Sequence, residues 1–528
     1  MVAEADTPDV AGAPAPWLRR ATVLGLGGAV LLYALRVDEV CGLYVDDGWY
    51  VLLAKALAAG QGYALPNAPS PGILPFYPPG FPWVLSWVFR IAPGFPANLW
   101  LLKSVSIVAM LATALLTMRY AVEVAGAGRA LALAIALATM LHPAFAFLAT
   151  ATVMSECVFT LAQLATVLLV ARAARGRAGT GTAFAAGGLG AFAFLVRSMA
   201  VGLLAAAGLC LAKERRWREL VAFGVGVVLL AGPWVLHARA HTPTPAQQAE
   251  MNDYVVFPYS VHFWSRVAGK PQFGTIEPSD LPARIVGIAK VVVTRDVGAL
   301  AVYPVYRLLE PGDWTKSGVP GTVVSVLVGV LMAIGYGRVV RRGIGVAEIL
   351  VPITLAIMLL WPFLPFRFVL PLLPFALCYL AGGLGPLVGR RATLGVVVAL
   401  ALVSVGADVA YVWRLRGPAE QRSLWQRAFE EHRDVIRWVR EHVPADQPVA
   451  AVDPALVALY DDGRKTVGYW QPQGAWAEWR RLGIHYMVDT TYLDEKDESL
   501  PEGRFVTVHR SATMNLRVLD LQRIYDPH

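Results

Sequence analysis

The sequence predicts an α-helical polytopic membrane protein with about eleven transmembrane helices and a small C-terminal extracytoplasmic α/β domain. Of the 528 residues, 56% are hydrophobic and only 16% are charged, and the mean hydropathy is +0.52. Soluble domains are more polar than this. Apolar stretches long enough to cross a bilayer recur along the chain, and the expected spans are 18–37, 97–119, 130–148, 153–171, 180–195, 198–212, 217–237, 319–338, 346–362, 366–387 and 392–412.

Clusters of arginine and lysine between these stretches predict the orientation, because cytoplasmic loops carry an excess of both residues. Such clusters stand at the start of the first span, at Arg19 and Arg20, and after every second span from there on, as at Arg390 and Arg391. We therefore expect a multi-pass protein of the bacterial inner membrane with a cytoplasmic N-terminus and an extracytoplasmic C-terminal domain. The net charge of +8 forms no basic face, which excludes nucleic acid as a partner.

The composition divides the chain into three expected parts. A tail rich in alanine and proline is expected to be disordered and cytoplasmic, the apolar region forms the membrane domain, and a more polar end contains the short strands PVAAVD and IHYMVD beside the helical stretch RSLWQRAFEEHRDVIRWVREHV. The parts are 1–17, 18–412 with outer loops at 38–96 and 238–317, and 417–528.

The first outer loop contains the strongest candidate for a functional site. Asp46 and Asp47 precede a short apolar helix at 49–59, and a second short helix is expected at 83–91. Both are too short to span and should lie along the membrane surface. An aspartate at this position can simply cap a helix. Two adjacent carboxylates at a lipid-facing surface repel each other, however, which favours a site.

Five segments stand out in order along the predicted spans: DDGWYVLLAKALAAGQGY, PFYPPGFPW, TVMSECVF, LVRSMAVGLL and PFRFVLPLLPF. Together they resemble the GT-C superfamily of membrane glycosyltransferases, which includes protein O-mannosyltransferases, lipid A aminoarabinose transferases and mycobacterial arabinosyltransferases. The resemblance covers residues 18–412 and implies a catalytic carboxylate in the first outer loop. Asp46 matches it best, and Asp47 is the second candidate.

The resemblance implies an inverting glycosyltransferase that uses a polyprenyl-phosphate sugar donor. Nucleotide sugars are absent outside the cytoplasm, so the donor must be carried by lipid. Polyprenyl phosphate leaves as a stable anion, so one carboxylate base is enough, whereas a glycosidase needs two. The expected partners are this donor, membrane lipid, and a protein, lipid or glycan acceptor. The identities of the sugar and the acceptor stay open.

Three cations are candidates for binding the donor phosphate. Arg197 and Arg367 lie at outward helix ends, where a charge is costly unless it is paired or functional. The planar guanidinium suits phosphate because it donates two parallel hydrogen bonds. Snorkelling towards lipid headgroups is the alternative for both arginines. Lys55, on the expected surface helix, is the third candidate.

Further polar residues are candidates for binding the acceptor, the sugar or a metal. Glu156 begins the fourth span, where it could pair with Arg197, orient the acceptor or join the two aspartates around a divalent cation, magnesium or manganese. The spacing is equally compatible with no metal, so no cofactor is assigned. His142, at a turn, is a further candidate ligand.

The long outer loop contains the segment NDYVVFPYSVHFWSRVAGK, in which aromatic and basic residues alternate. Aromatic faces stack on sugar rings, and the basic groups could reach phosphate. An interfacial aromatic belt explains the same composition. An amphipathic helix is expected at about 282–301. The candidates in this loop are Tyr254, His262, Arg266 and Lys270.

Three other classes of protein are alternatives to a glycosyltransferase. A lipid-linked sugar transporter or flippase would place charges near the middle of the membrane, where this sequence has almost none. An enzyme of the O-antigen polymerase or ligase type would have its catalytic centre on a later large loop. A receptor or structural module would leave the two aspartates of the first outer loop unexplained.

Overall fold

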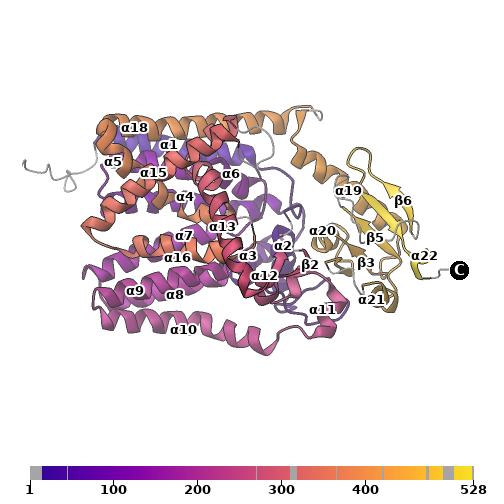
Figure 1. The fold of residues 1–528 in the computed structure, drawn as a ribbon. Coiled ribbons are helices and arrows are strands. Elements are labelled where there is room, and N and C mark those ends of the chain that lie inside the picture. The colour runs from indigo at the N-terminus through magenta and orange to yellow at the C-terminus, as the bar shows by residue number, and fades with distance from the viewer. Residues whose placement is uncertain are drawn as a thin grey trace, which may run out of the picture.

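The computed structural model describes residues 15–44, 46–268, 270–309, 318–363, 366–418, 421–470, 475–490 and 505–525. A bundle of long helices forms one end of the molecule, and a smaller part with a β-sheet forms the other (Figure 1). The first helix begins at Pro16, so most of the expected N-terminal tail lies outside the described residues.

Each apolar stretch that was expected to span the membrane lies in a helical segment, which confirms the predicted fold class. In the described ranges, six segments are long and apolar enough to cross a membrane on their own. They are α1 (Pro16–Arg36), α4 (Leu99–Glu123), α7 (Glu156–Ala174), α10 (Trp217–Ala240), α15 (Val319–Arg342) and the segment of α17 (Phe366–Val369), η5 (Leu370–Leu372) and α18 (Leu373–Arg416).

The remaining expected spans are bent, short or joined to a neighbour. α5 (Arg129–Met140) and α6 (Pro143–Thr150) meet at an angle of 50°, and the shorter apolar segments are α8 (Thr180–Val196), η1 (Ser198–Ala200) with α9 (Val201–Lys213), and α16 (Val346–Leu360). The continuous segment of α17, η5 and the 44-residue α18 contains both of the last two expected spans. Gly389, with φ 81° and ψ 163°, interrupts its helical backbone between them.

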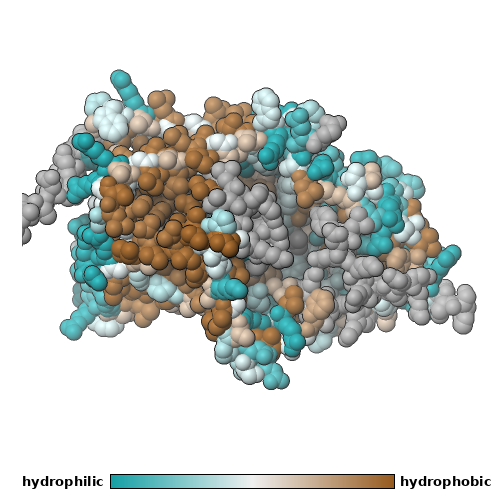
Figure 2. Space-filling model, turned by 45° about the horizontal axis from the view of Figure 1, so that its top comes forward, coloured by the Kyte–Doolittle hydropathy of each residue, from teal (hydrophilic) through white to brown (hydrophobic). Residues whose placement is uncertain are grey.

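Glycines let several of these helices touch backbone to backbone. A Cβ atom on Gly335 of α15 would lie 1.8 Å from the carbonyl oxygen of Tyr379 on α18, and one on Gly187 of α8 would lie 2.1 Å from the carbonyl oxygen of Phe223 on α10. Small residues are the usual means of close helix packing in membranes. The outward face of the bundle is apolar, and Figure 2 shows hydrophobic side chains gathered over it, as expected of a surface in contact with lipid.

The two outer loops contain short elements packed above the bundle. The first contains α2 (Asp46–Ala58) and α3 (Gly80–Ile91), close to the expected helices. Gly80 lies against the end of α8, since a Cβ atom there would be 2.6 Å from the carbonyl carbon of Leu195. The second contains α11 (Pro245–Met251), η2 (Tyr254–Val256), α12 (Tyr259–Trp264), β1 (Ser265–Val267), β2 (Lys270–Thr275), η3 (Pro278–Asp280), α13 (Leu281–Val291), η4 (Val292–Asp296) and α14 (Val297–Leu309).

The C-terminal part is a five-stranded sheet with helices, in the strand order β4-β3-β5-β7-β6. β4, β3 and β5 are parallel, and β7 pairs antiparallel with both β5 and β6. Ala450 is in register with Met487. The elements are α19 (Leu424–His442), β3 (Val449–Ala451), α20 (Pro454–Tyr460), β4 (Thr466–Val467), α21 (Ala475–Arg481), β5 (Tyr486–Asp489), β6 (Val506–Arg510), β7 (Arg517–Asp520) and α22 (Gln522–Tyr525).

This C-terminal part is held against the outer loops by backbone hydrogen bonds. The Thr466 N–H donates to the Asn67 carbonyl at 2.9 Å, and the Gly468 N–H donates to the Met251 carbonyl at 2.7 Å. Helix α20 packs on α2, the helix that begins at Asp46. The C-terminal part therefore packs against the helix that carries both candidate carboxylates.

Candidate active site

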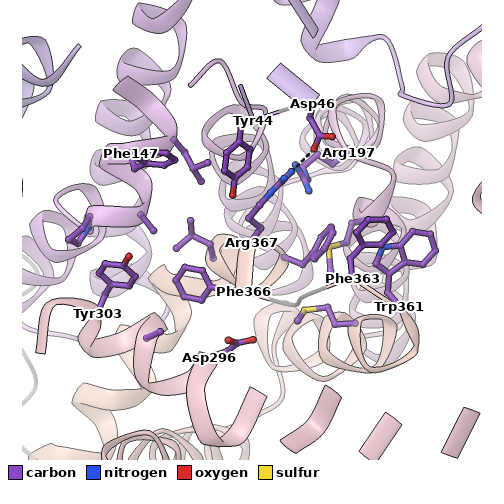
Figure 3. Close-up of a pocket in the computed structure, with 18 of the residues that line it drawn as sticks. Tyr44, Asp46, Phe147, Arg197, Asp296, Tyr303, Trp361, Phe363, Phe366 and Arg367 are labelled. Carbon is purple, nitrogen blue, oxygen red and sulfur yellow. Dashed lines mark hydrogen bonds and ion pairs between the residues drawn. The ribbon is translucent and has the colours of Figure 1, made fainter. Parts of the chain in front are cut away.

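A cavity of about 1460 Å³ lies between the helix bundle and the outer loops. Several elements form its walls. They are the start of α2, the ends of α1 and α8, η1, α6, α14, α16, α17, α18, the first turn of α19 and the two outer loops. Figure 3 shows Asp46, Arg197 and Arg367 pointing towards one another at this cavity. The candidate residues of the first loop and of two distant spans are thus brought together.

Asp46 is the carboxylate that faces the cavity. Its Oδ1 accepts hydrogen bonds from the hydroxyls of Tyr77 at 2.5 Å and Tyr254 at 3.0 Å. Its Oδ2 accepts from Nη2 of Arg367 at 2.8 Å. Asp46 is also the first residue of α2, where the positive end of the helix dipole favours a negative charge.

Arg367 and Arg197 are joined through Glu156. Nε of Arg367 and Nη1 of Arg197 lie 2.8 and 2.9 Å from the same oxygen of Glu156, and Nη1 of Arg197 also donates to the Ser155 hydroxyl at 3.0 Å. The Glu156 side chain is fully buried, so its charge requires such partners. Both arginines contact carboxylates at the cavity wall, which is not the geometry expected of snorkelling side chains.

The electrostatic environment keeps Asp46 ionised. Burial by itself raises the pKa of this carboxyl, but the charge of Arg367 and the hydrogen bond from Tyr77 outweigh it, so the pKa lies below its ordinary value. Burial also raises the pKa of the Tyr77 hydroxyl, which stays a neutral donor. Asp46 is therefore a carboxylate at neutral pH.

Asp47 occupies a different environment. Its side chain is fully buried and does not line the cavity. Oδ1 accepts a hydrogen bond from the Tyr44 N–H at 3.1 Å, and Oδ2 has no hydrogen-bond donor among the residues that the structure describes. Burial raises its pKa to about 6. These contacts suit a residue that stabilises the turn before α2.

The other candidates are spread over several environments. Tyr254 and His262 line the cavity, and Nε2 of His262 donates to the Tyr254 carbonyl at 3.1 Å. His142 instead caps α6, accepting a hydrogen bond from the Ala144 N–H at 3.2 Å. The remaining candidates are Lys55 and Arg266, which do not line the cavity, and Lys270, whose side chain lies outside the described part of the chain.

The arrangement does not fit a metal held by the three acids considered from the sequence. Asp47 faces away from the cavity, while Asp46 and Glu156 share Arg367 between them. Across the described ranges, no three histidine, cysteine, aspartate or glutamate side chains cluster as metal ligands would. The positive charge beside Asp46 comes from guanidinium groups.

Sequence reasoning missed two contributors to this site, Tyr77 and Tyr44. Tyr77 stands in the proline-rich motif PFYPPGFPW, and the guanidinium of Arg367 lies over the ring of Tyr44, 5.1 Å from its centroid. The sequence held a signal for each: Tyr44 stands two residues before Asp46, and Tyr77 lies within a motif that carries the family resemblance. Many outer-loop residues are aromatic, however, so composition did not distinguish these two.

The fold is of the GT-C type, as the resemblance predicted from the sequence, and it is shared with solved structures over most of this chain. The chain is similar to ArnT from Cupriavidus metallidurans bound to undecaprenyl phosphate, with a TM-score of 0.52, 14% identity, and coverage of 96% of this chain and 98% of that one. It is also similar to the Archaeoglobus fulgidus oligosaccharyltransferase in the apo form, with a TM-score of 0.53, 13% identity, and coverage of 90% and 70%. No protein-family model and no curated protein matches the sequence.

Proposed function

We propose that this protein is an inverting glycosyltransferase that moves a sugar from a polyprenyl-phosphate donor to an acceptor hydroxyl on the extracytoplasmic face of the membrane. One observation carries the proposal: an ionised carboxylate, Asp46, faces a large cavity 2.8 Å from the guanidinium of Arg367. A base and a phosphate-binding cation thus stand side by side. The similarity in fold to ArnT, which was solved with undecaprenyl phosphate, supports the class of donor.

The reaction needs one proton acceptor. The acceptor oxygen attacks the anomeric carbon of the sugar, the bond from that carbon to the phosphate oxygen breaks, and its electron pair leaves with the polyprenyl phosphate. The acceptor proton passes to Asp46. A single displacement inverts the anomeric centre. A positioned general base contributes about 10²- to 10⁴-fold to such a rate.

The two arginines serve the leaving group. Arg197, Arg367, Asp46 and Glu156 carry two positive and two negative charges, so a phosphate can enter without meeting excess negative charge. Negative charge grows on the phosphate as the bond breaks, and fixed guanidinium groups stabilise it there. The apolar wall at Met199, Ile357 and Met358 suits the hydrocarbon chain of the donor.

Replacing Asp46 by asparagine tests the proposal. The purified full-length protein would be incubated with a panel of undecaprenyl-phosphate sugars and bacterial envelope extract, and release of undecaprenyl phosphate would be measured. We expect Asp46→Asn to lose transfer by at least about 100-fold while it still binds undecaprenyl phosphate. The matched control is Asp446→Asn, at an exposed loop position. Full activity of Asp46→Asn would refute the mechanism, and movement of intact donor across the membrane without transfer would favour a flippase.

A further inference from the structure

The cavity has two chemically different sides, and Arg367 stands between them. In Figure 3, Trp361 and Phe363 lie on one side of Arg367, while Phe147 and Tyr303 lie on the other. The first side continues into the apolar wall at Met199, Ile357 and Met358, which is proposed above to hold the hydrocarbon chain of the donor. The second side continues to the ends of α1 and α18 and to the first turn of α19, and its polar groups have no role in the proposed reaction.

Three aromatic rings form part of this second side. Tyr44 of the first outer loop, Phe147 of α6 and Trp425 of α19 pack edge to face, with ring centroids 5.3 to 6.1 Å apart. Trp425 thereby brings the C-terminal domain to the cavity wall. Its buried Nε1 has no hydrogen-bond acceptor in the described part of the chain. A buried donor without a partner costs free energy, and a ligand in the cavity could supply the missing acceptor.

One oxygen of a buried carboxylate on the same side also lacks a hydrogen-bond partner. Arg36 and Asp408 form an ion pair of 2.6 Å, and both line the cavity. The Arg36 guanidinium lies 4.1 Å from the ring centroid of Tyr411. Asp408 is fully buried, and its Oδ2 receives no hydrogen bond from any described residue. The pair therefore leaves one carboxylate oxygen able to accept a hydrogen bond.

We propose that this second side is the acceptor subsite and that the acceptor is a saccharide. The inference rests on the proposed function and adds the chemical class of the acceptor. A sugar ring has apolar faces that pack on aromatic rings, hydroxyls that donate to a carboxylate, and oxygens that accept from an indole N–H. An acyl chain would leave Oδ2 of Asp408 and Nε1 of Trp425 without hydrogen-bond partners. The guanidinium of Arg367 lies over the ring of Tyr44 and donates to Asp46, so this subsite adjoins the proposed base.

Ligand binding to the full-length protein in detergent tests the subsite. Mannotriose, galactotriose, arabinotriose and a serine- and threonine-rich decapeptide would each be titrated by ligand-observed NMR. We expect at least one trisaccharide to bind, and Trp425→Ala to weaken that binding about tenfold. The matched control is Trp413→Ala, because Trp413 is 76% exposed on α18 and does not line the cavity. Phe147→Leu, which keeps an apolar side chain, should also weaken binding and covers the case in which Trp425→Ala does not fold.

Undecaprenyl phosphate titrated into the same samples separates the two proposals. We expect it to bind the wild type and both tryptophan variants equally. If it binds but no trisaccharide does, if only the peptide binds, or if Trp425→Ala and Phe147→Leu bind the trisaccharide as the wild type does, the saccharide subsite is wrong and the proposed function stands. If undecaprenyl phosphate fails to bind the wild type, the proposed function fails and the subsite inference fails with it.

Discussion

Replacing Arg367 by alanine should weaken binding of the donor phosphate more than binding of any acceptor. Arg367 makes two charge-assisted hydrogen bonds of 2.8 Å, to Asp46 and to Glu156, so it is held in place before the donor arrives. A hydrogen bond to a charged group contributes about 1.5 to 3 kcal/mol, which corresponds to about a 10- to 150-fold higher Kd for undecaprenyl phosphate. Arg197 remains, which limits the loss to this range.

The assay is a titration of undecaprenyl phosphate into the purified protein, with thermal unfolding as a check on folding. Arg90→Ala is the matched control, because Arg90 is exposed on α3 and stacks on Trp87 outside the cavity. Arg367→Ala also removes the main cation that lowers the pKa of Asp46. The pH at which the transfer rate falls on the acid side should therefore be higher than in the wild type. A folded Arg367→Ala protein with a Kd within about twofold of the wild type would refute the phosphate-binding role.

Three further predictions concern stability and pH. The pKa of Asp47 is raised from 3.8 to about 6 in the folded protein, so the contribution of Asp47 to stability falls as the pH rises through that window. Asp47→Asn should therefore raise the free energy of unfolding at pH 7.5 by up to about 3 kcal/mol. A lower melting temperature of the variant at that pH would contradict this prediction. Gly335→Ala should abolish folded yield in gel filtration because its methyl group would meet the Tyr379 carbonyl, whereas Gly337→Ala, with open space around it, should not. Because the pKa of Asp46 is lowered, its protonation should reduce the transfer rate only below the ordinary pKa of an aspartate. The measurement uses Asp47→Asn, which removes the neighbouring carboxyl that titrates near pH 6, and a loss of rate near pH 6 in that variant would exclude Asp46 as the base.

The membrane fold could be predicted because its signals are local. Apolar stretches of span length fix where helices form, whatever they pack against. The same reasoning singled out Glu156, Arg197 and Arg367, because ionisable residues within or beside spans are rare and need partners. The structure places all three in one network with Asp46.

What could not be predicted depends on how distant segments turn and meet. Consecutive helical residues point about 100° apart, so only the rotation of α2 decides that Asp46 faces the cavity while Asp47 is buried. The contact of Tyr254 with Asp46 joins residues 208 positions apart, and the Arg36–Asp408 pair spans 372 positions. Neither pairing leaves a trace in local composition.

The contact at Gly80 has a mechanical consequence. Helix α3 begins there with no room for a methyl group against the backbone at Leu195, two residues before Arg197, and further along α3 exposes Trp83 and Trp87. Indole rings anchor at the boundary between headgroups and hydrocarbon. A thicker or thinner bilayer that pulled on this anchor would therefore push directly on the backbone beside Arg197, making the geometry of the proposed site sensitive to the lipid composition around the protein.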